Sequence, residues 1–237
     1  MGQSYFVWNG VDCRSMGVNL AGPVPIVRPE ERVNHVTIPG RSGDLTTTEG
    51  ENIYNSYIQT VTIHVKGHYR VRDIYKWLRG SGYVTFSGEP DRRQKARIIG
   101  AVTLNKHSKN VDVWVGEVQF YCQPLKELLS EESVTVSSSG TEVLNNGDVT
   151  SRPLLTVTAS STTITVAAGG NSITVNSVST SSVTVIDCDV MEVANATKTT
   201  LLTKDAVGDF PVLHPGNNEV TGTGWSSIEI DRRERFL

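Results

Sequence analysis

Apolar and polar residues alternate with a spacing of two along most of the chain, which is the pattern of half-buried β-strands. In the first 130 residues this pattern predicts strands at residues 5–8, 36–38, 57–65, 83–86, 96–104 and 111–121, the last two joined as a hairpin around 105–110. Beyond residue 130 it predicts strands at 134–136, 155–157, 164–166, 173–175, 183–185, 191–193, 219–220 and 227–231. The chain is therefore predicted to be mainly β.

One segment has helical rather than strand periodicity. Val71, Ile74, Tyr75 and Leu78 recur at positions i, i+3, i+4 and i+7, and Gly80 follows them. An acidic residue in the first turn, here Asp73, suits the positive end of a helix, and glycine is a common stop signal. A single short helix over residues 71–79 is expected to pack on the sheets.

The composition changes near residue 130. Between Ser130 and Val185 roughly four in ten residues are Ser or Thr, and Trp, Tyr, Phe and His are absent. Residues 1–130 carry 16 basic and 12 acidic side chains, whereas the remainder carries 6 and 13. These shifts predict two domains, 1–130 and 131–237, with a mobile connection at 137–146. A disordered Ser/Thr-rich tract is the rival interpretation of the second part, but alternating β-branched residues favour an antiparallel sandwich.

Overall composition narrows the class of protein. With 237 residues and 38% hydrophobic residues, the chain can bury a substantial core, which argues against a disordered protein. It contains neither a long apolar run nor an apolar signal segment, so we expect a soluble protein made in a cytoplasm, with no membrane partner. Cys13, Cys122 and Cys188 are far apart in sequence and are expected to be buried free thiols.

Candidate chemical sites are weak. His64 and His68 are four apart, but in a strand they would lie about 13 Å from each other, which disfavours a shared metal. Asp187 and Asp189 could face a cation or a sugar, although capping of a turn is the simpler interpretation. The segment around Ser42 lacks the pattern of a nucleophile elbow. We therefore expect no catalytic residue, no metal and no cofactor, and hence no enzyme.

A cluster of basic side chains is the remaining charged feature. Arg92, Arg93, Lys95 and Arg97 follow Tyr83 and Phe86 in the sequence. Basic residues interleaved with aromatic ones can bind single-stranded nucleic acid. The alternative is the charged rim of a strand or a contact between subunits, and we expect no specific nucleic-acid partner.

Several motifs resemble one known family. The opening Phe6-Val7-Trp8-Asn9-Gly10-Val11-Asp12 and the later Ile38-Pro39-Gly40-Arg41-Ser42-Gly43-Asp44-Leu45 resemble the N-terminal domain of the distal tail protein (Dit) of long-tailed siphophages. The segments 208–218 and 228–233 resemble the end of that family's C-terminal galectin-like sandwich. The resemblance spans the whole chain.

The resemblance implies a structural protein of the virion tail tip. It implies an N-terminal domain related to tail-tube folds, a β-sandwich with one helix and an extended belt arm, followed by the outward galectin-like sandwich. Family members form a ring of six that joins the tail tube protein to the tail-tip hub protein and can support receptor-binding proteins. DNA would pass through the ring without specific recognition.

The long polar segment over residues 40–56 matches the implied belt arm. A long polar arm buries its own backbone groups poorly, so a neighbouring subunit would be their natural partner. The contact candidates are Pro39, Gly40, Arg41, Gly43, Thr46, Thr47 and Thr48. Arg41 is expected to bond to the neighbour, although a solvated arginine in a mobile loop is the alternative.

Two other functions stay open at this stage. A carbohydrate-binding module that attaches the virion to host wall polymers would need an exposed aromatic ring, and the late part of the chain offers only Phe210 and Trp225. A wall hydrolase would need two carboxylates about 5 to 10 Å apart across a cleft, and no such pair is indicated.

Overall fold

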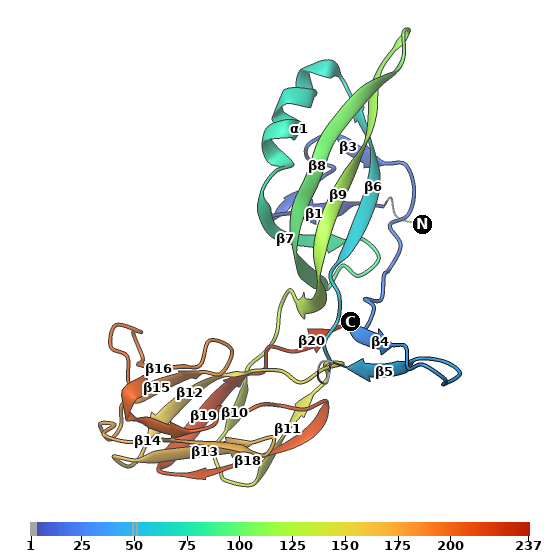
Figure 1. Cartoon of the computed structure of the whole chain (residues 1–237). Helices are drawn as coiled ribbons and strands as arrows, with labels where there is room; N and C mark the ends of the chain where they lie inside the picture. The colour runs from blue at the N-terminus through green and yellow to red at the C-terminus, as the bar shows by residue number, and fades with distance from the viewer. Residues whose placement is uncertain (1–3, 49, 51) are drawn as a thin grey trace. The chain divides into compact units, whose positions relative to one another are not determined.

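The chain divides into two compact units in the computed structural model, which describes residues 4–48, 50 and 52–237 (Figure 1). The N-terminal unit comprises Met1–Leu129 with Leu237, and the C-terminal unit comprises Ser130–Phe236. Each unit has its own hydrophobic core. Strands dominate both units, and one short α-helix occurs among the described residues, which confirms the mainly β prediction.

The N-terminal unit is built on one antiparallel sheet. Its strands lie in the order β2-β1-β7-β8-β9-β6-β3. Their bounds are β1 (Phe6–Trp8), β2 (Val11–Asp12), β3 (Val18–Leu20), β6 (Tyr57–Lys66), β7 (Ser81–Phe86), β8 (Arg92–Ser108) and β9 (Val111–Leu128). The last two are longer than the predicted 96–104 and 111–121: β8 starts at Arg92 and ends at Ser108, and β9 continues to Leu128. Shifts in pairing register, such as that between Ile99 and Thr103, interrupt the long hairpin.

Aromatic residues form the centre of this unit. The ring of Phe6 stacks on Trp77 at 5.6 Å and meets Phe120 edge-on at 5.3 Å. The Asn9-Gly10 pair that follows β1 has positive φ at both residues, 50° and 80°, as a tight two-residue hairpin turn requires. The aromatic-Asn-Gly start of the chain therefore supplies both a core strand and the turn that ends it.

The predicted helix covers one face of the sheet. A 3-10 turn, η1 (His68–Arg70), leads into α1 (Val71–Trp77), which is two residues shorter than predicted. Ile74 is fully buried, and the hydroxyl of Tyr75 accepts a hydrogen bond from the Leu104 amide at 3.2 Å. No helix in the described ranges is long and apolar enough to cross a membrane.

The C-terminal unit is a sandwich of two antiparallel sheets. One has the order β10-β19-β12-β15-β16 and the other β11-β18-β13-β14-β17. The bounds are β10 (Val134–Val136), β11 (Thr141–Asn145), β12 (Leu154–Ala159), β13 (Ile164–Ala168), β14 (Asn171–Val175), β15 (Val183–Asp187), β16 (Glu192–Asn195), β17 (Ala206–Gly208), β18 (Gly216–Thr223) and β19 (Trp225–Asp231), with η2 (Thr203–Asp205) before β17 and β20 (Arg235–Phe236) after β19.

The Ser/Thr-rich strands follow the inside-outside rule of a sandwich. In β12, Leu155, Val157 and Ala159 are almost completely buried while the intervening threonines are partly exposed. On the opposite sheet the hydroxyls of Thr165 and Thr174 are 3.0 Å apart across the strand pair. Threonine thus supplies a β-branched residue that tolerates water, and small aliphatic residues form the core.

The prediction of a mobile connection at 137–146 is wrong over much of that segment. Within 137–146 the structure forms β11, which pairs with β18 along all five residues. The Asn145 amide group, in a residue only 1% exposed, donates to the carbonyls of Val149 and Leu213. Glu234 accepts hydrogen bonds from both the backbone and the side chain of Asn146. These polar residues look like a linker in the sequence but are held by buried hydrogen bonds.

Replacing Asn145 tests this assignment. In Asn145→Ala we expect a loss of about 2 to 3 kcal/mol of unfolding free energy, because buried carbonyls and the Gly147 amide lose their partner. The neighbouring Leu144→Ala, at a side chain that is 48% exposed, is the control and should cost about 0.5 kcal/mol or less. Denaturant unfolding measures both. Equal effects of the two substitutions would contradict the buried role of Asn145.

Candidate functional site

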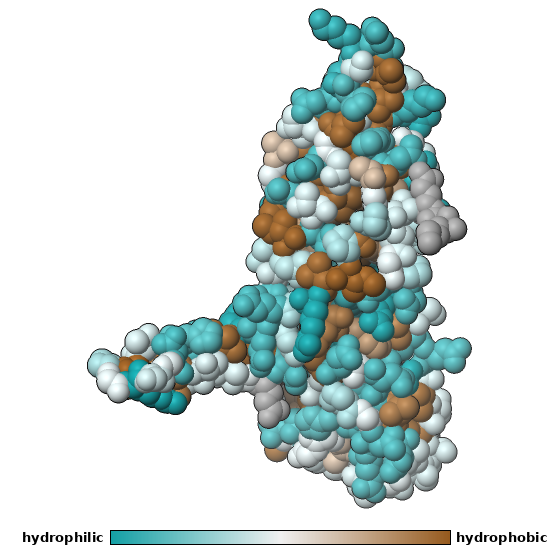
Figure 2. Space-filling model, turned by 90° about the vertical axis from the view of Figure 1, so that its right-hand side faces the viewer, coloured by the Kyte–Doolittle hydropathy of each residue, from teal (hydrophilic) through white to brown (hydrophobic). Residues whose placement is uncertain are grey.

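A separate two-stranded hairpin is the clearest candidate for an interaction site. Within the described residues, strands β4 (Val33–Val36) and β5 (Leu45–Thr48) pair only with each other. We call residues 33–48 the arm. Figure 2 shows it as a narrow projection on which brown apolar residues lie among teal polar ones.

The arm differs from the predicted excursion in two ways. It starts at Val33, seven residues before the predicted Gly40, and the predicted strand 36–38 ends at Val36 because the chain then enters the turn. The backbone groups that face inward are paired across the hairpin, with Val33 opposite Thr48 and Val36 opposite Leu45. The expectation that the arm buries its backbone groups poorly therefore holds only for the outer edges of the two strands, which pair with no other described strand.

The motif from Pro39 to Gly43 forms the tip of the arm. Gly40 and Gly43 have φ of 81° and 77°, a region that favours glycine, and nothing lies within 4 Å of a Cβ added to either. The Arg41 amide donates to the Ile38 carbonyl at 3.1 Å, which closes the turn. The Arg41 side chain is exposed and forms no ion pair or hydrogen bond within the described part of the chain.

The two faces of the arm differ in polarity. On the polar face, His35 Nδ1 lies 3.1 Å from the Thr46 hydroxyl, and the Thr37 hydroxyl donates to Asp44 at 2.9 Å. Because side chains alternate across a strand, the other face carries Asn34, Thr47 and three apolar residues. We call these three, Val36, Ile38 and Leu45, the apolar triad.

The apolar triad is exposed in the single chain. The exposed fractions are 49% for Val36, 37% for Ile38 and 39% for Leu45, and none belongs to a core cluster. The sequence analysis did not include these three residues among its contact candidates, which on β5 are Thr46, Thr47 and Thr48. The direct pairing of Val36 with Leu45 requires the hairpin register, which the sequence pattern did not indicate.

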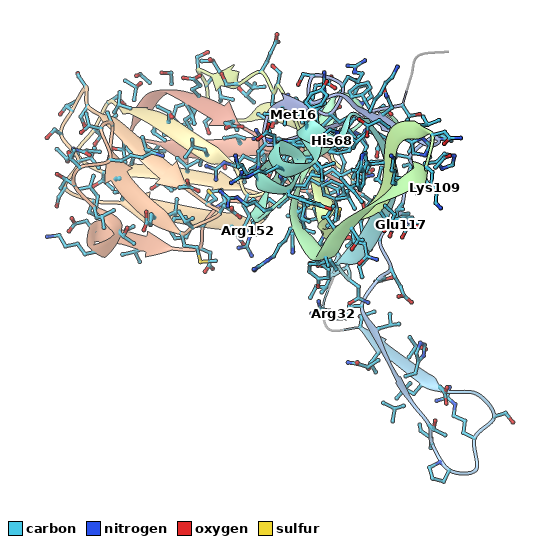
Figure 3. The ribbon with its side chains drawn as sticks, turned by 90° about the horizontal axis from the view of Figure 1, so that it is seen from above. Met16, Arg32, His68, Lys109, Glu117 and Arg152 are labelled. Carbon is cyan, nitrogen blue, oxygen red and sulfur yellow. The ribbon has the colours of Figure 1, made fainter. Side chains whose placement is uncertain are left out.

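The two segments that lead into and out of the arm are hydrogen-bonded to each other. The Arg32 amide donates to the Ile53 carbonyl at 2.8 Å, and the Asn55 amide donates to the Glu30 carbonyl at 2.7 Å. Arg32 Nε also donates to the side-chain oxygen of Asn55 at 3.1 Å. Figure 3 shows the arm leaving the unit near Arg32, with side chains standing off the ribbon. Hydrogen bonds thus close the root of the arm, while its triad stays exposed.

Comparison with solved structures finds a likeness over the full length of the chain. The crystal structure of the Dit protein (gp 19.1) of phage SPP1 matches with a TM-score of 0.81 at 20% identity, covering 100% of both chains. Its description calls that protein a paradigm of the hub adsorption apparatus in phages that infect Gram-positive bacteria. The chain has the fold of a distal tail protein. No family model and no curated protein sequence matches it.

The C-terminal motifs behind the predicted resemblance have structural roles. In the segment 208–218, the side chain of Asn218 accepts from the His214 amide and donates to its carbonyl, which fixes a turn. In the final motif, Arg232 pairs with Glu234 at 3.1 Å, and Arg233 pairs with Asp187 at 2.6 Å. These contacts explain why both motifs belong to the sandwich.

The two histidines do not form a metal site with each other. His64 lies within β6, whereas His68 lies beyond Gly67 in η1 and is 3.4 Å from Asp112. Among the described residues, no group of three or more His, Cys, Asp or Glu side chains is placed to hold a metal ion.

The acidic pair also has a structural explanation. Asp187 accepts hydrogen bonds from the amides of Asp189 and Val190, so it caps the turn after β15. The guanidinium of Arg233 forms a second, two-pronged contact with the same carboxylate. These hydrogen bonds hold the pKa of Asp187 below its ordinary value despite partial burial.

Neither candidate aromatic residue forms an open sugar platform. Trp225 packs against the core of the C-terminal unit and donates from its indole nitrogen to the Thr165 carbonyl at 3.1 Å. Phe210 packs against the same core. Cys13, Cys122 and Cys188 are buried free thiols, and burial raises the pKa of Cys122 and Cys188 to about 12.

The Asp187–Arg233 pair predicts a pH-dependent contribution to stability. Because the folded state lowers the pKa of Asp187, the stabilisation is fully present above the ordinary value of 3.8 and disappears as pH falls through the lowered folded value. Arg233→Met should lose about 1 to 3 kcal/mol of unfolding free energy near neutral pH. The difference from wild type should shrink in strong acid.

Thermal or denaturant unfolding across that pH range measures the effect. Arg152→Met provides a control at an exposed arginine with no ion pair in the described ranges, and it should differ little from wild type at any pH. An Arg233→Met deficit that stays constant into strong acid would show that the carboxylate of Asp187 is not responsible.

Proposed function

We propose that the chain is a structural protein of a phage tail tip, in which copies assemble into a ring of six that joins the tail tube to the tail-tip hub. The observation that carries this proposal is the likeness to SPP1 Dit over the full length of both chains. A match restricted to one unit would support only a shared sandwich. The match over both units and the arm supports a shared architecture.

The arm supports the assembly part of the proposal. A two-stranded hairpin is marginally stable alone in water, and three or more strands or a packed face are normally needed. The arm has neither within the chain, and its triad is exposed. Contact with a neighbouring copy would bury the triad and could pair the outer edges. Such a contact joins two different patches, which is the arrangement that closes a ring.

The two units would then have different roles. The N-terminal unit, which carries the arm, would form the ring, and its partners would be other copies, the tail tube protein and the hub protein. The C-terminal unit, with the predicted galectin-like fold, would lie at the periphery and could support a receptor-binding protein. The protein would be made in the host cytoplasm and function in the virion.

The arrangement favours a binding role over catalysis. The side chains considered as candidate sites in the sequence have structural contacts instead. Asp187 caps a turn, His68 pairs with Asp112, and Trp225 packs on the core. By contrast, the tip residue Arg41 and the triad are exposed and lack partners in the described part of the chain. We infer that Pro39, Gly40, Arg41 and Gly43 contact a neighbouring copy, together with Thr46, Thr47 and Thr48.

Replacement of the arm tests this function. Wild-type protein should show a mass of six times the 25.8 kDa chain by light scattering, at concentrations that permit assembly. Replacing residues 33–48 with a short Gly-Ser segment should leave a folded monomer, because the arm contributes no residue to either core cluster. The monomer should keep its cooperative unfolding transition.

A second variant separates loss of the arm from loss of its contacts. Val36→Ser with Leu45→Ser keeps the hairpin but removes most of the apolar triad, so it should also weaken assembly. Thr37→Ala with Asp44→Ala, on the polar face and outside the contact candidates, is the matched control and should assemble more fully. If the protein without residues 33–48 still has the wild-type mass, the arm has no role in assembly.

A further inference from the structure

Three charged side chains lie close together within the C-terminal unit. Arg232 approaches Glu131 to 3.4 Å and pairs with Glu234 at 3.1 Å. The side chains of Glu131, Arg232 and Glu234 are only 12%, 15% and 2% exposed. We call these three residues the buried charge cluster. It contains two carboxylates and one guanidinium, so when both acids are ionised it buries an excess negative charge.

Glu234 is the better satisfied of the two carboxylates. Its Oε1 accepts hydrogen bonds from the backbone amide of Asn146 at 2.9 Å and from the side-chain amide of Asn146 at 3.0 Å. The same oxygen lies 3.1 Å from Nη1 of Arg232. Hydrogen bonds to an ionised acceptor are stronger than those between neutral groups. Glu234 therefore serves as the negative partner of Arg232.

Glu131 has much poorer partners. Its Oε2 accepts one hydrogen bond, from the backbone amide of Glu234 at 3.2 Å. Its Oε1 lies 3.4 Å from Nε of Arg232, but both atoms are buried and neither has a hydrogen-bond partner in the described part of the chain. A buried carboxylate with so few donors is costly to keep charged. Within the cluster, Glu131 is thus the group suited to hold a proton.

The guanidinium of Arg232 is largely directed at other acceptors. Nη1, besides its contact with Glu234, donates to the Leu144 carbonyl at 3.1 Å, and Nη2 donates to the Glu132 carbonyl at 3.4 Å. These bonds join residues 131–132 to the end of β11 and to the segment after β19. Arg232 therefore holds the backbone around Glu131 in place without making a hydrogen bond to its carboxylate.

The charges around Glu131 act in the same direction as its burial. Burial is the largest cause that raises the pKa of Glu131 above its ordinary value, and the negative charges of Asp231 and Glu234 add to it. The bond from the Glu234 amide and the charge of Arg232 oppose the increase without cancelling it. The contacts from β11 and the turn after it come from neutral groups, the Leu144 carbonyl and the Asn146 amides.

We propose that Glu131 is a buried proton-binding site, and that uptake of one proton from water holds the charge cluster closed. With Glu131 neutral, one carboxylate faces one guanidinium and no excess charge is buried. With Glu131 ionised, the excess charge favours opening of residues 131–132, which lets water solvate the carboxylate. The cluster is thus held more firmly in mild acid than at neutral pH. This inference does not depend on the proposed ring.

The proton site gives stability a pH dependence of definite sign. Because the folded state raises the pKa of Glu131, the stabilisation is fully present below the ordinary value of 4.5 and is lost as pH rises through the raised folded value. The contribution of Asp187 has the opposite sign, since it is lost as pH falls below 3.8. The two effects therefore occupy different pH ranges and can be measured separately.

Titration of the carboxyl group tests the proton site directly. Carbon-13 NMR of the full-length protein follows the glutamate carboxyl resonances, and the resonance that Glu131→Gln removes is that of Glu131. We expect this resonance to titrate above 4.5, the ordinary value. Titration at or below that value would overturn the inference.

Hydrogen exchange at the Glu234 amide measures closing of the cluster, because this amide donates to the Glu131 carboxyl. After correction for the intrinsic pH dependence of exchange, its protection in wild-type protein should be several-fold higher in mild acid than at neutral pH. Glu131→Gln cannot ionise and should show high protection under both conditions. Glu132→Gln, at an exposed neighbour that forms no ion pair in the described ranges, is the matched control and should keep the wild-type response.

Denaturant unfolding distinguishes a proton site from an ordinary ion pair. If Glu131 is a proton site, Glu131→Gln is at least as stable as wild type at neutral pH and loses any advantage in mild acid. A variant that is less stable than wild type at neutral pH and recovers in acid would show Glu131 to be a stabilising anion. That result, or an unchanged pH response of the Glu234 amide in Glu131→Gln, would overturn the inference and leave the proposed function untouched.

Discussion

A two-stranded hairpin cannot cover the apolar side chains that it carries. The arm brings Val36, Ile38 and Leu45 to one face, and the backbone of a hairpin offers nothing to bury them against. A third strand or a packed surface normally supplies that burial. The chain provides firm hydrogen bonds at the base of the arm and no cover at its end, so the apolar triad is left exposed within the part of the chain that the structure describes.

The C-terminal unit, by contrast, buries its apolar side chains within its own sandwich. Its two sheets bury each other's aliphatic residues, and Ser and Thr occupy the outward positions where water is the partner. Its ionic contacts are also internal, as the Asp187–Arg233 and Arg232–Glu234 pairs show. Its exposed apolar residues, such as Val190 and Val207, are not grouped on a separate hairpin as the triad of the arm is.

The sequence predicted the parts of the fold that follow from local periodicity. Alternation located the strands of the sandwich, and Ile74 and Leu78 identified the buried side of the helix. The strand at 141–145 was missed because Asn145 and Asn146 resemble turn residues, and only the partners Leu213 and Glu234, distant in sequence, hold them in place. The arm was predicted from the Gly-rich motif, but its triad was missed because hairpin register depends on which residues pair.

The candidate site shows the same division between local and distant information. Gly40 and Gly43 were assigned to a long excursion over residues 40–56, and the structure places both, with positive φ, in the turn at the tip of the arm. The basic cluster was visible in the sequence, and Glu89 lies only three residues before its partner Arg92, but Arg93 pairs with Glu127 of the neighbouring strand β9. Electrostatic partners of this kind cannot be assigned until the sheet order is known.

Hydrogen exchange of the arm amides tests most directly whether a second copy covers the arm. The amides of β4 and β5 would be followed by mass spectrometry in the assembled and monomeric fractions of the same preparation. The account predicts that exchange over residues 33–48 is strongly slowed in the assembled fraction and fast in the monomer, because contact with a neighbour removes water from the arm. Equally fast exchange of these residues in both fractions would contradict it.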